Sequence, residues 1–471
     1  MGGRKQEAHA RGREAAEGGN GGERGESVML SALLFVLFFC LLLIHVPVAF
    51  ALGVSALVIL VLGSGFSSLA LLPSIMYSSI SSFTLLAIPF FVLAGVIMSY
   101  SGISKRLVDF AYLCFGHKKN GIVIVAIVAA LFFSAISGSG PATVAAMGAI
   151  LIPALVKNGF NKNSASALIA SSGALGIILP PSIAFIIFGV IANDFVGISI
   201  SRLFVAGIIP GLLLAAGLLV ASIFASKRVS HLQTASKRPD EAAASVERAS
   251  LAAILKAFYR ALFGLLVPVI IMGGIYSGMF TPTEAAVVAV FYALLVGGVF
   301  YREIKLKHLG RILVDSSVQS AVIMFIIGAA SLFSYLVTTQ HVAEGMTQAV
   351  LGLTENRVLL LLLTAVILLV IGAFIDAISA FYIFVPILMP ILLEVGVDPT
   401  TIGVLMTVAL AIGLFTPPVG LNLFVASGIS GVPSEQIVRG IGPFLVSSIV
   451  VLLIVMYVPA VSNWLPDLLN L

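Results

Sequence analysis

The sequence predicts an all-α polytopic membrane protein, built as an inverted repeat with two re-entrant hairpins and two broken helices. Hydrophobic residues make up 60% of the chain, charged residues make up 10%, and mean hydropathy is +1.17. This composition excludes a soluble globular protein. Two stretches, 121–156 and 358–393, are long and almost free of charge, and each is interrupted near its middle. They also match each other in a fixed register.

An internal repeat relates these two stretches. Adding 237 to a residue number maps Pro153 onto Pro390 and Gly176 onto Gly413. Only 20 of 471 residues are Pro, so prolines seldom align by chance. The two adjacent proline pairs match in the same register and are Pro180–Pro181 and Pro417–Pro418.

Composition divides the chain into four parts. Residues 1–28 are polar and Gly-rich and lack the apolar core of a signal peptide. We predict a disordered or misassigned N-terminal extension there, with Met29 as the natural start. A first inverted repeat is expected at 29–225, a cytoplasmic linker and interfacial arm at 226–260, and a second repeat at 261–471.

Each uncharged stretch is too long for a single membrane helix. A helix of 36 residues, the length of 121–156, would measure about 54 Å, whereas the hydrocarbon core is about 30 Å thick. The interruption is Ser137–Pro141, where small residues tolerate non-helical backbone and Pro suits the first turn of a new helix. Basic residues on both sides place both ends in the cytoplasm and predict a re-entrant hairpin. They are His117, Lys118, Lys119, Lys157 and Lys162.

The stretch 358–393 is expected to form the second hairpin. It contains one carboxyl group, that of Asp376, close to its midpoint. Because its flanking charges are nearly balanced, we expect this hairpin to open on the opposite face of the membrane. These flanking residues are Glu355, Arg357, Glu394 and Asp398.

The remaining apolar segments of the first half predict five spans. Pro47 divides 30–62 into two short crossings, and 65–82 is polar enough to lie along the membrane interface. Pro180–Pro181 breaks a further span and frees carbonyl and amide groups at mid-membrane depth. The other expected elements are a crossing at 84–100, the broken span at 162–192 and a crossing at 204–224.

The second half is predicted to repeat this order in the opposite direction. A basic stretch at 302–311 should lie along the interface before a crossing at 320–338. Pro417–Pro418 should break the span equivalent to the one at Pro180–Pro181. Ten crossings and two hairpins result, and the other expected crossings are near 262–278, at 282–301 and at a last span ending near Trp464.

Polar residues at the interruptions are the candidate binding groups. In secondary transporters, half-helix N-termini face anionic groups and unwound carbonyls coordinate a cation. Ser137, Ser139 and Thr143 supply hydroxyls at the first interruption, and Asn422 follows the second proline pair. An unpaired charge at the bilayer centre costs at least about 2.5 kcal/mol, so we expect a cation partner for Asp376. A structural role for Asp376, bonded to the backbone, is the alternative.

Other functional classes fit the sequence less well. A Ser–His protease needs a His at membrane depth, and an aspartyl protease needs a second carboxylate beside Asp376, so we do not predict an enzyme. The formal charge of +5 lies mainly in short loops, which indicates membrane topology and no nucleic-acid partner. Cys40 and Cys114 lie in or beside apolar segments and predict neither a disulfide framework nor a metal site.

Four motifs resemble a known family. Together they resemble the large membrane subunit, of the dicarboxylate-permease M type, of tripartite ATP-independent periplasmic (TRAP) transporters. The resemblance covers essentially Met29 to Leu471. The motifs are SGSGPATVAAMG at 137–148, LGIILPPSIAF at 175–185, GMFTPTEAA at 278–286 and IGLFTPPVGLNLFVASGISG at 412–431.

This resemblance implies a sodium-coupled, elevator-type importer in the bacterial inner membrane. Such a subunit works with a small four-helix TRAP membrane subunit, expected here as a separate chain. A periplasmic solute-binding protein delivers the substrate, an organic anion that we expect to be a carboxylate such as a C4-dicarboxylate or a sugar acid. Sodium is the coupling ion, and no organic cofactor is implied. A stand-alone sodium/dicarboxylate symporter without a binding protein is the alternative.

The resemblance also places the candidate site. It puts the first hairpin tip at Ser137–Pro141 and the second at Gly372–Asp376, with the broken spans at Gly176–Ser182 and Gly413–Asn422. The chain departs from the family pattern at Ala409, where Asn is frequent, and at Ser379, where Pro is frequent. The expected substrate-binding residues are Ser137, Ser139, Thr143, Pro181, Ser182 and Asn422. The expected sodium-binding residues are Gly138, Gly140, Gly176, Gly372, Asp376, Gly413 and Thr416.

Overall fold

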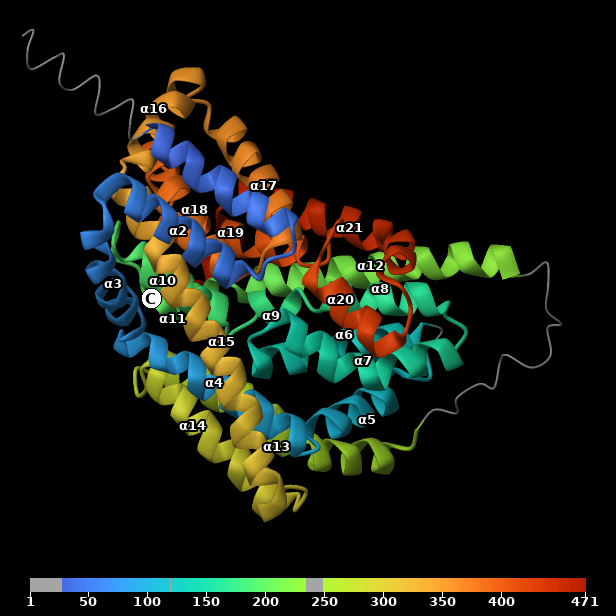
Figure 1. Ribbon diagram of the computed structural model, residues 1–471. Coiled ribbons are helices and arrows are strands. Elements are labelled where there is room, and N and C mark those ends of the chain that lie inside the picture. Colours follow the sequence, from blue (N-terminus) through green and yellow to red (C-terminus); the bar gives the residue numbers. More distant parts are fainter. Residues whose placement is uncertain (1–27, 119, 234–248) are drawn as a thin grey trace, which may run out of the picture. The chain divides into compact units, whose positions relative to one another are not determined.

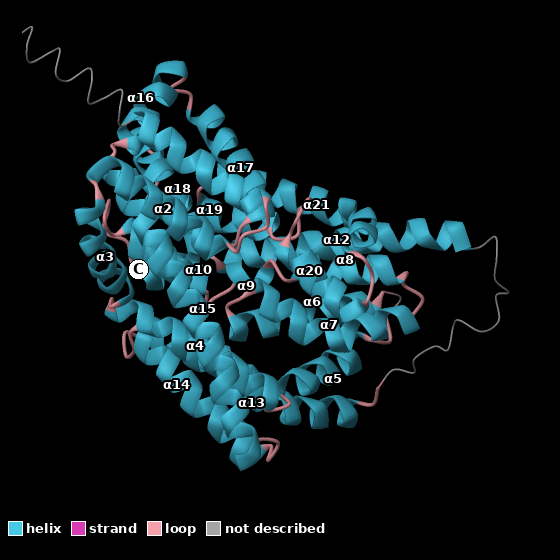
Figure 2. Ribbon diagram, viewed as in Figure 1, coloured by secondary structure: helices cyan, strands magenta, loops and turns pink. Residues whose placement is uncertain are grey.

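The computed structural model describes residues 28–118, 120–233 and 249–471 (Figure 1). Within these ranges every regular element is a helix, as Figure 2 shows, so the all-α prediction is confirmed. Apart from Val28, the predicted N-terminal extension lies outside the described residues. The described residues belong to two compact units.

The first unit combines the N-terminal helices with Met324–Glu355 and Tyr382–Ile391. Its first two helices are separate and meet at Pro47, as predicted. The buried rings of Phe38 and Phe333 pack with centroids 5.5 Å apart. The helices in this unit are Val28–Leu43, α2 (Val48–Ser64), η1 (Phe66–Ala70), α3 (Leu71–Ile80), α16 (Val342–Leu353) and the C-terminal part of α15 (Leu306–Thr339).

Two pairs of long helices form one part of the second unit. α4 packs along α14, and α5 packs along α13. α14 begins at a capping box in which Thr281 Oγ1 accepts from the Glu284 amide at 3.3 Å and the Glu284 carboxylate accepts from the Thr281 amide at 2.8 Å. The elements here are η2 (Phe83–Leu86), α4 (Ala87–Tyr100), α5 (Ile103–Phe115), α13 (Leu251–Tyr276), α14 (Pro282–Leu295) and η3 (Val296–Phe300).

The internal repeat is visible in the helix boundaries. α7 (Gly140–Lys157) and α18 (Ala377–Glu394) begin and end at positions that differ by 237. α8 (Lys162–Ser172) and α19 (Pro399–Gly413) begin at positions with the same difference. Both predicted proline pairs contain a cis peptide bond. The repeat that the prolines and glycines predicted is therefore present in the three-dimensional structure.

The other helices complete the second unit. α6 and α17 precede the two interruptions, and the α7, α8 and α20 helices lie together with α6 (Figure 1). The remaining helices are α6 (Gly121–Ser137), α9 (Leu175–Ile178), α10 (Ile183–Ala192), α11 (Ile200–Ala206), α12 (Ile208–Gln233), α17 (Arg357–Phe374), α20 (Leu421–Ser430), α21 (Ser434–Tyr457) and α22 (Ala460–Leu468).

Two segments are more helical than the sequence analysis expected. α15 runs without interruption from Leu306 to Thr339, so residues 306–311 of the predicted interfacial stretch belong to the same helix as the predicted crossing at 320–338. Lys and Arg are good helix formers, and the basic residues there simply extend the crossing helix. Likewise, α12 reaches Gln233 and α13 starts at Leu251, so helical residues occupy both ends of the predicted linker.

The described helices are suited to a bilayer. Nine of them are long and apolar enough to cross a membrane, and one bent pair makes a tenth candidate. That pair consists of Lys162–Ile178 and Ile183–Ala192, which meet at 44° on either side of the first proline pair. Pro cannot donate the backbone hydrogen bond that would continue a helix, so the break falls where the sequence placed it.

Candidate functional site

The first hairpin tip is held by its own hydroxyl groups. α6 ends at Ser137, and α7 begins at Gly140 with Ser139 as its extended N-cap. Ser137 Oγ lies 2.8 Å from Thr143 Oγ1, which donates to the carbonyl oxygen of Ser139 at 2.8 Å. The hydroxyls of Ser137 and Thr143 are buried and therefore shape the tip, whereas Ser139 is half-buried.

The first tip lies directly against the first broken span. The amide of Ile183 donates to the carbonyl oxygen of Gly138 at 3.4 Å. A Cβ atom on Gly138, whose φ is +60°, would lie 2.7 Å from the carbonyl oxygen of Pro181. A Cβ atom on Gly176 would lie 2.5 Å from the carbonyl oxygen of Ser139. Real Cβ atoms do not approach oxygen so closely, so this backbone contact requires both glycines.

Asn422 connects the second broken span to the first half of the repeat. Its Nδ2 donates to the carbonyl oxygen of Ala170 in α8 at 3.2 Å, and its backbone amide donates to the carbonyl oxygen of Leu414 at 2.9 Å. Its Oδ1 is fully buried and has no hydrogen-bond partner among the described residues. A Cβ atom on Gly140 would lie 3.2 Å from this Oδ1 and 3.1 Å from the carbonyl oxygen of Gly173.

The second tip makes a similar backbone contact. A Cβ atom on Gly413 in α19 would lie 2.6 Å from the Cα atom of Gly372 in α17. The amide of Gly420 donates to the carbonyl oxygen of Ala373 at 2.9 Å. The second hairpin tip and the second broken span are thus joined through their main chains, as the first pair is.

Asp376 is the N-cap of α18. Its Oδ2 accepts from the amides of Ile378 and Ser379 at 2.9 and 3.2 Å, and its Oδ1 accepts from Ser379 Oγ at 2.7 Å. A carboxylate at this position satisfies free amides of the first helical turn and interacts favourably with the helix dipole. Asp376 therefore has the structural role that the sequence analysis left open. Its equivalent in the first repeat, Ser139, is the N-cap of α7.

Three further predicted residues belong to the broken spans. Ser182 Oγ donates to the carbonyl oxygen of Ile177 and accepts from the Phe185 amide, so it serves its own broken helix. Thr416 Oγ1 donates to the carbonyl oxygen of Ile412 at 2.8 Å. Pro181 and Ser182 are buried, which keeps them from reaching a ligand in this conformation.

A cavity of about 750 Å³ opens beside the first tip. Ser137, Ser139 and Pro141 line one side of it. The lining includes one charged side chain, that of Lys105 in α5. Of the six predicted substrate-binding residues, only Ser137 and Ser139 line this cavity, whereas Thr143, Pro181, Ser182 and Asn422 do not.

Four polar residues of this cavity were missed by the sequence analysis. They are Ser99 in α4, Ser104 and Lys105 in α5, and Gln319 in α15. No motif surrounds them, and they are distant from Ser139 in the sequence. Tertiary packing alone brings them to the cavity, although a Lys beside apolar helices was a weak signal.

These features define a class of protein. A helical membrane protein with two repeats, each joining an interrupted helix pair to a proline-broken span, has the layout of a secondary transporter. The cavity at one interruption, which is lined by the hydroxyl groups of Ser137 and Ser139 and by Lys105, fits that class.

Comparison with known proteins identifies the family. Residues 35–461 match the family model described as tripartite ATP-independent periplasmic transporter, DctM component. The chain belongs to this family, so it is a transporter subunit and not an enzyme. Because the transporter serves the periplasm and its spans are helical, the chain is a multi-pass protein of the bacterial inner membrane.

Individual relatives cover most of the chain. The C4-dicarboxylate TRAP transporter large permease protein DctM of Pseudomonas aeruginosa is 40% identical over 84% of this chain and 89% of its own length. The sialic acid TRAP transporter large permease protein SiaM of Vibrio cholerae is 35% identical over 91% of this chain and 96% of its own length. The isethionate TRAP transporter permease protein DctMQ of Oleidesulfovibrio alaskensis is 41% identical over 91% of this chain, which spans 65% of that relative's length.

A solved structure shares the fold. The crystal structure of the Alcanivorax borkumensis YdaH transporter, described as having an unusual topology, superposes with a TM-score of 0.56. The match covers 92% of this chain and 99% of that one at 14% sequence identity, so it shows the fold alone. The predicted fold class, a polytopic inverted repeat with two hairpins and two broken helices, is confirmed.

Proposed function

We propose that the chain is the large subunit of a sodium-coupled importer that moves an organic anion across the inner membrane. The names of the relatives cited above include C4-dicarboxylate, sialic acid and isethionate, which are all acids, and we expect a carboxylate here. The tripartite, periplasmic description of the family supports a small four-helix membrane subunit and a periplasmic solute-binding protein as partners. The observation that carries the proposal is the buried, unpartnered Oδ1 of Asn422.

The surroundings of Asn422 fit a sodium ion. A buried oxygen without a hydrogen bond costs about 1–3 kcal/mol, and a cation bound to it removes that cost. The Nδ2 of Asn422 is fixed by Ala170, which leaves Oδ1 aimed at the space beside Gly140 and the carbonyl oxygen of Gly173. Carbonyl oxygens freed by broken helices are the usual sodium ligands in transporters. We therefore assign Asn422 to sodium, in place of the substrate-binding role expected from the sequence, together with backbone at Gly138, Gly140 and Gly176.

The repeat supports a second sodium position at the second tip. Gly372 and Gly413 bring the backbones of α17 and α19 together there, beside Thr416. The Asp376 carboxylate accepts three hydrogen bonds, and two carboxylate oxygens offer about four acceptor sites. Asp376 can therefore cap α18 and still offer one lone pair to a cation. These four residues are our proposed second site.

The cavity at the first tip is the proposed path of the anion. The N-terminus of α7 begins at its wall, and helix N-termini favour negative charge. Ser139 is half-buried there, and Lys105 supplies a positive charge in the same lining. A carboxylate in this cavity would contact the α7 N-terminus, Ser139 and Lys105.

The close contacts also bear on the transport motion. The glycines at 138 and 176 join the first tip to the first broken span with no room for a side chain between them. The hydrogen bond from Asn422 to Ala170 connects the first broken span to the second broken span. We propose that these elements move together as one rigid body in an elevator-type mechanism, because sliding at these contacts would require the backbones to separate.

Reconstituted transport tests the proposal. The full chain and the small subunit would be placed in proteoliposomes, with the binding protein outside carrying radiolabelled succinate or a labelled sugar acid. We expect uptake only with an inward sodium gradient and the binding protein present. Equal uptake in a matched potassium gradient would contradict sodium coupling.

The same experiment separates the alternative function. A stand-alone symporter would take up the free anion with the large subunit alone and without the binding protein. Strict dependence on all three proteins is the expected result.

A further inference from the structure

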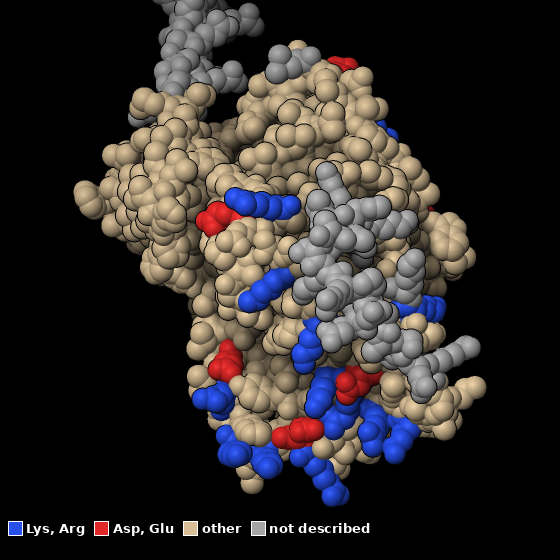
Figure 3. Space-filling view, turned by 90° about the vertical axis from the view of Figure 1, so that its right-hand side faces the viewer, with Lys and Arg blue, Asp and Glu red and all other residues tan. Residues whose placement is uncertain are grey.

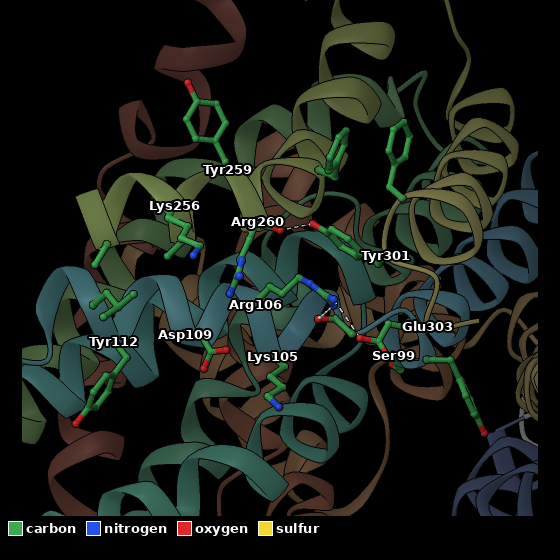
Figure 4. Close-up of a pocket in the computed structure, with 17 residues that line it drawn as sticks. Ser99, Lys105, Arg106, Asp109, Tyr112, Lys256, Tyr259, Arg260, Tyr301 and Glu303 are labelled. Atoms are coloured by element: carbon green, nitrogen blue, oxygen red, sulfur yellow. Dashed lines mark hydrogen bonds and ion pairs between the residues drawn. The ribbon is translucent and has the colours of Figure 1, made fainter. Parts of the chain in front are cut away.

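A second and larger cavity lies away from the hairpin tips. It has a volume of about 1130 Å³ and is bounded by α5, the first turns of α13 and the segment that follows η3 (Figure 4). Ser99, Gly102 and Lys105 line both this cavity and the proposed anion path. The rest of its lining belongs to no predicted site, and the proposed transport mechanism does not use it.

Basic side chains outnumber acidic ones in this cavity. Lys105 and Arg106 come from α5, and Lys256 and Arg260 come from the facing side of α13 (Figure 4). The acidic lining residues are Asp109 and Glu303. Figure 3 shows Lys and Arg side chains gathered over the lower part of one face, with fewer Asp and Glu side chains among them.

Only one of these four basic groups is engaged within the described part of the chain. Arg106 Nη2 lies 3.0 Å from Glu303 Oε1, and its guanidinium lies 4.0 Å from the centre of the Tyr301 ring. The Tyr301 hydroxyl donates to the carbonyl oxygen of Arg260 at 2.5 Å and so ties this corner to α13. Neither Lys256 nor Arg260 takes part in an ion pair among the described residues. Their charges are available to an anion.

The helix that carries Lys256 and Arg260 also presents an apolar face. The side chains of Leu255 and Tyr259, one turn apart, are 53% and 61% exposed, and Tyr259 also lines the cavity. Residues at this spacing lie on one face of a helix. Lys256 and Arg260 lie one turn apart on a different face. The start of α13 is therefore amphipathic, with a basic face toward the cavity and an apolar face beside it.

We propose that this cavity binds the headgroup of an anionic phospholipid. The phosphodiester would lie against the α13 pair, Lys256 and Arg260, and the acyl chains would run along Tyr259 and Leu255. Basic cavities between membrane helices on the cytoplasmic side suit such headgroups. A free phosphate would use the charges but leave the exposed apolar face without a partner, so the observations favour the lipid.

Native mass spectrometry of the full chain in mild detergent tests this assignment. The chain would be titrated with phosphatidylglycerol, with phosphatidylcholine of the same acyl chains, and with glycerol 3-phosphate. We expect phosphatidylglycerol to bind roughly tenfold more tightly than phosphatidylcholine, and glycerol 3-phosphate not to compete. The double variant Lys256→Gln/Arg260→Gln should lose the preference. Neither residue lines the proposed anion path, so transport chemistry does not confound the result.

A matched control tests whether the lipid preference depends on the charges in this cavity or only on the total charge of the chain. Lys157→Gln/Lys162→Gln removes two exposed charges that do not line this cavity and should keep the preference. Arg260→Lys keeps the positive charge, so it should keep most of the preference for phosphatidylglycerol. This variant provides the test if the double variant is unstable. Equal binding of the two lipids, full competition by glycerol 3-phosphate, or an unchanged preference in the double variant would overturn the proposal. If the parent chain showed no lipid preference and the double variant failed to bind the small subunit, the lipid proposal would be overturned in favour of a protein partner.

Discussion

The side-chain amide of Asn422 donates a hydrogen bond to the main-chain oxygen of Ala170 at 3.2 Å, across 252 residues of sequence. This bond fixes the orientation of the amide, since an oxygen in place of Nδ2 would face another oxygen. The remaining amide oxygen is buried beside Gly140 with no hydrogen-bond donor among the described residues. This hydrogen bond thus joins the two repeats, and it leaves the amide oxygen beside the first hairpin tip available to a cation.

The backbone contact between the first tip and the first broken span predicts a stability effect. Gly176→Ala would place a methyl group 2.5 Å from both the carbonyl oxygen of Ser139 and Thr143 Oγ1. We expect a loss of about 1–3 kcal/mol in the free energy of unfolding, because the backbones cannot separate without breaking the tip. Thermal unfolding of the purified chain measures it.

Gly428→Ala is the matched control for that substitution. Gly428 lies in α20, and a Cβ atom there would meet no atom within 4 Å. Because Ala favours a helix over Gly by about 1 kcal/mol, this variant should be unchanged or more stable. Equal effects at the two positions would show that the tip contact is not close.

The second sodium position predicts that a substitution of Asp376 can abolish sodium-dependent transport without preventing folding. Asp376→Asn keeps an oxygen that can accept from the Ile378 and Ser379 amides, and Asn is a good N-cap, so the chain should assemble normally. Uptake should no longer respond to sodium, because the carboxylate charge is lost. Sodium activation curves measured in proteoliposomes test this, and an unchanged curve would leave Asp376 with its capping role alone.

Ser379→Ala is the companion variant. It removes the 2.7 Å hydrogen bond from Ser379 Oγ to Asp376 Oδ1 and retains the charge. We expect a loss of about 0.5–1.5 kcal/mol in stability and retention of sodium activation. If Ser379→Ala and Asp376→Asn lose sodium activation equally, the orientation of the carboxylate matters as much as its charge.

Lys105 predicts an effect on the anion. It is the charged side chain in the cavity beside Ser139, so Lys105→Gln should weaken the electrostatic attraction for a carboxylate there. We expect several-fold slower uptake that depends less on ionic strength, with Lys105→Arg close to the parent chain. Lys157→Gln, which removes a charge outside the cavity, should leave the rate unchanged. Identical rates in Lys105→Gln and the parent chain would exclude Lys105 from the path.

The breaks in the helices could be predicted from the sequence because Pro and Gly act locally on the backbone. Pro and Gly restrict or free the backbone at their own positions, so the interruption at Ser137–Pro141 and the proline pairs could be located without a structure. The fixed difference of 237 then held for the boundaries of α7 and α18. The chain's own composition identified the membrane class.

The features of the site that could not be predicted from the sequence depend on long-range packing. Thr143 and Ser182 have hydroxyls at suitable places, but these bond to nearby main-chain oxygens and do not reach the cavity. The contact of Asn422 with Ala170 joins helices that no motif relates. The capping role of Asp376 could have been predicted more firmly, because an Asp directly before a helix is a common N-cap.

Direct measurement of sodium binding to Asn422 variants tests the central claim. Isothermal titration of the purified full chain with sodium chloride, against a potassium chloride control, gives the affinity of the parent chain and of Asn422→Ala. We predict that Asn422→Ala weakens sodium binding by roughly tenfold or more, since one buried ligand is lost. Sodium affinity that is the same in both chains would contradict a cation site built on Asn422.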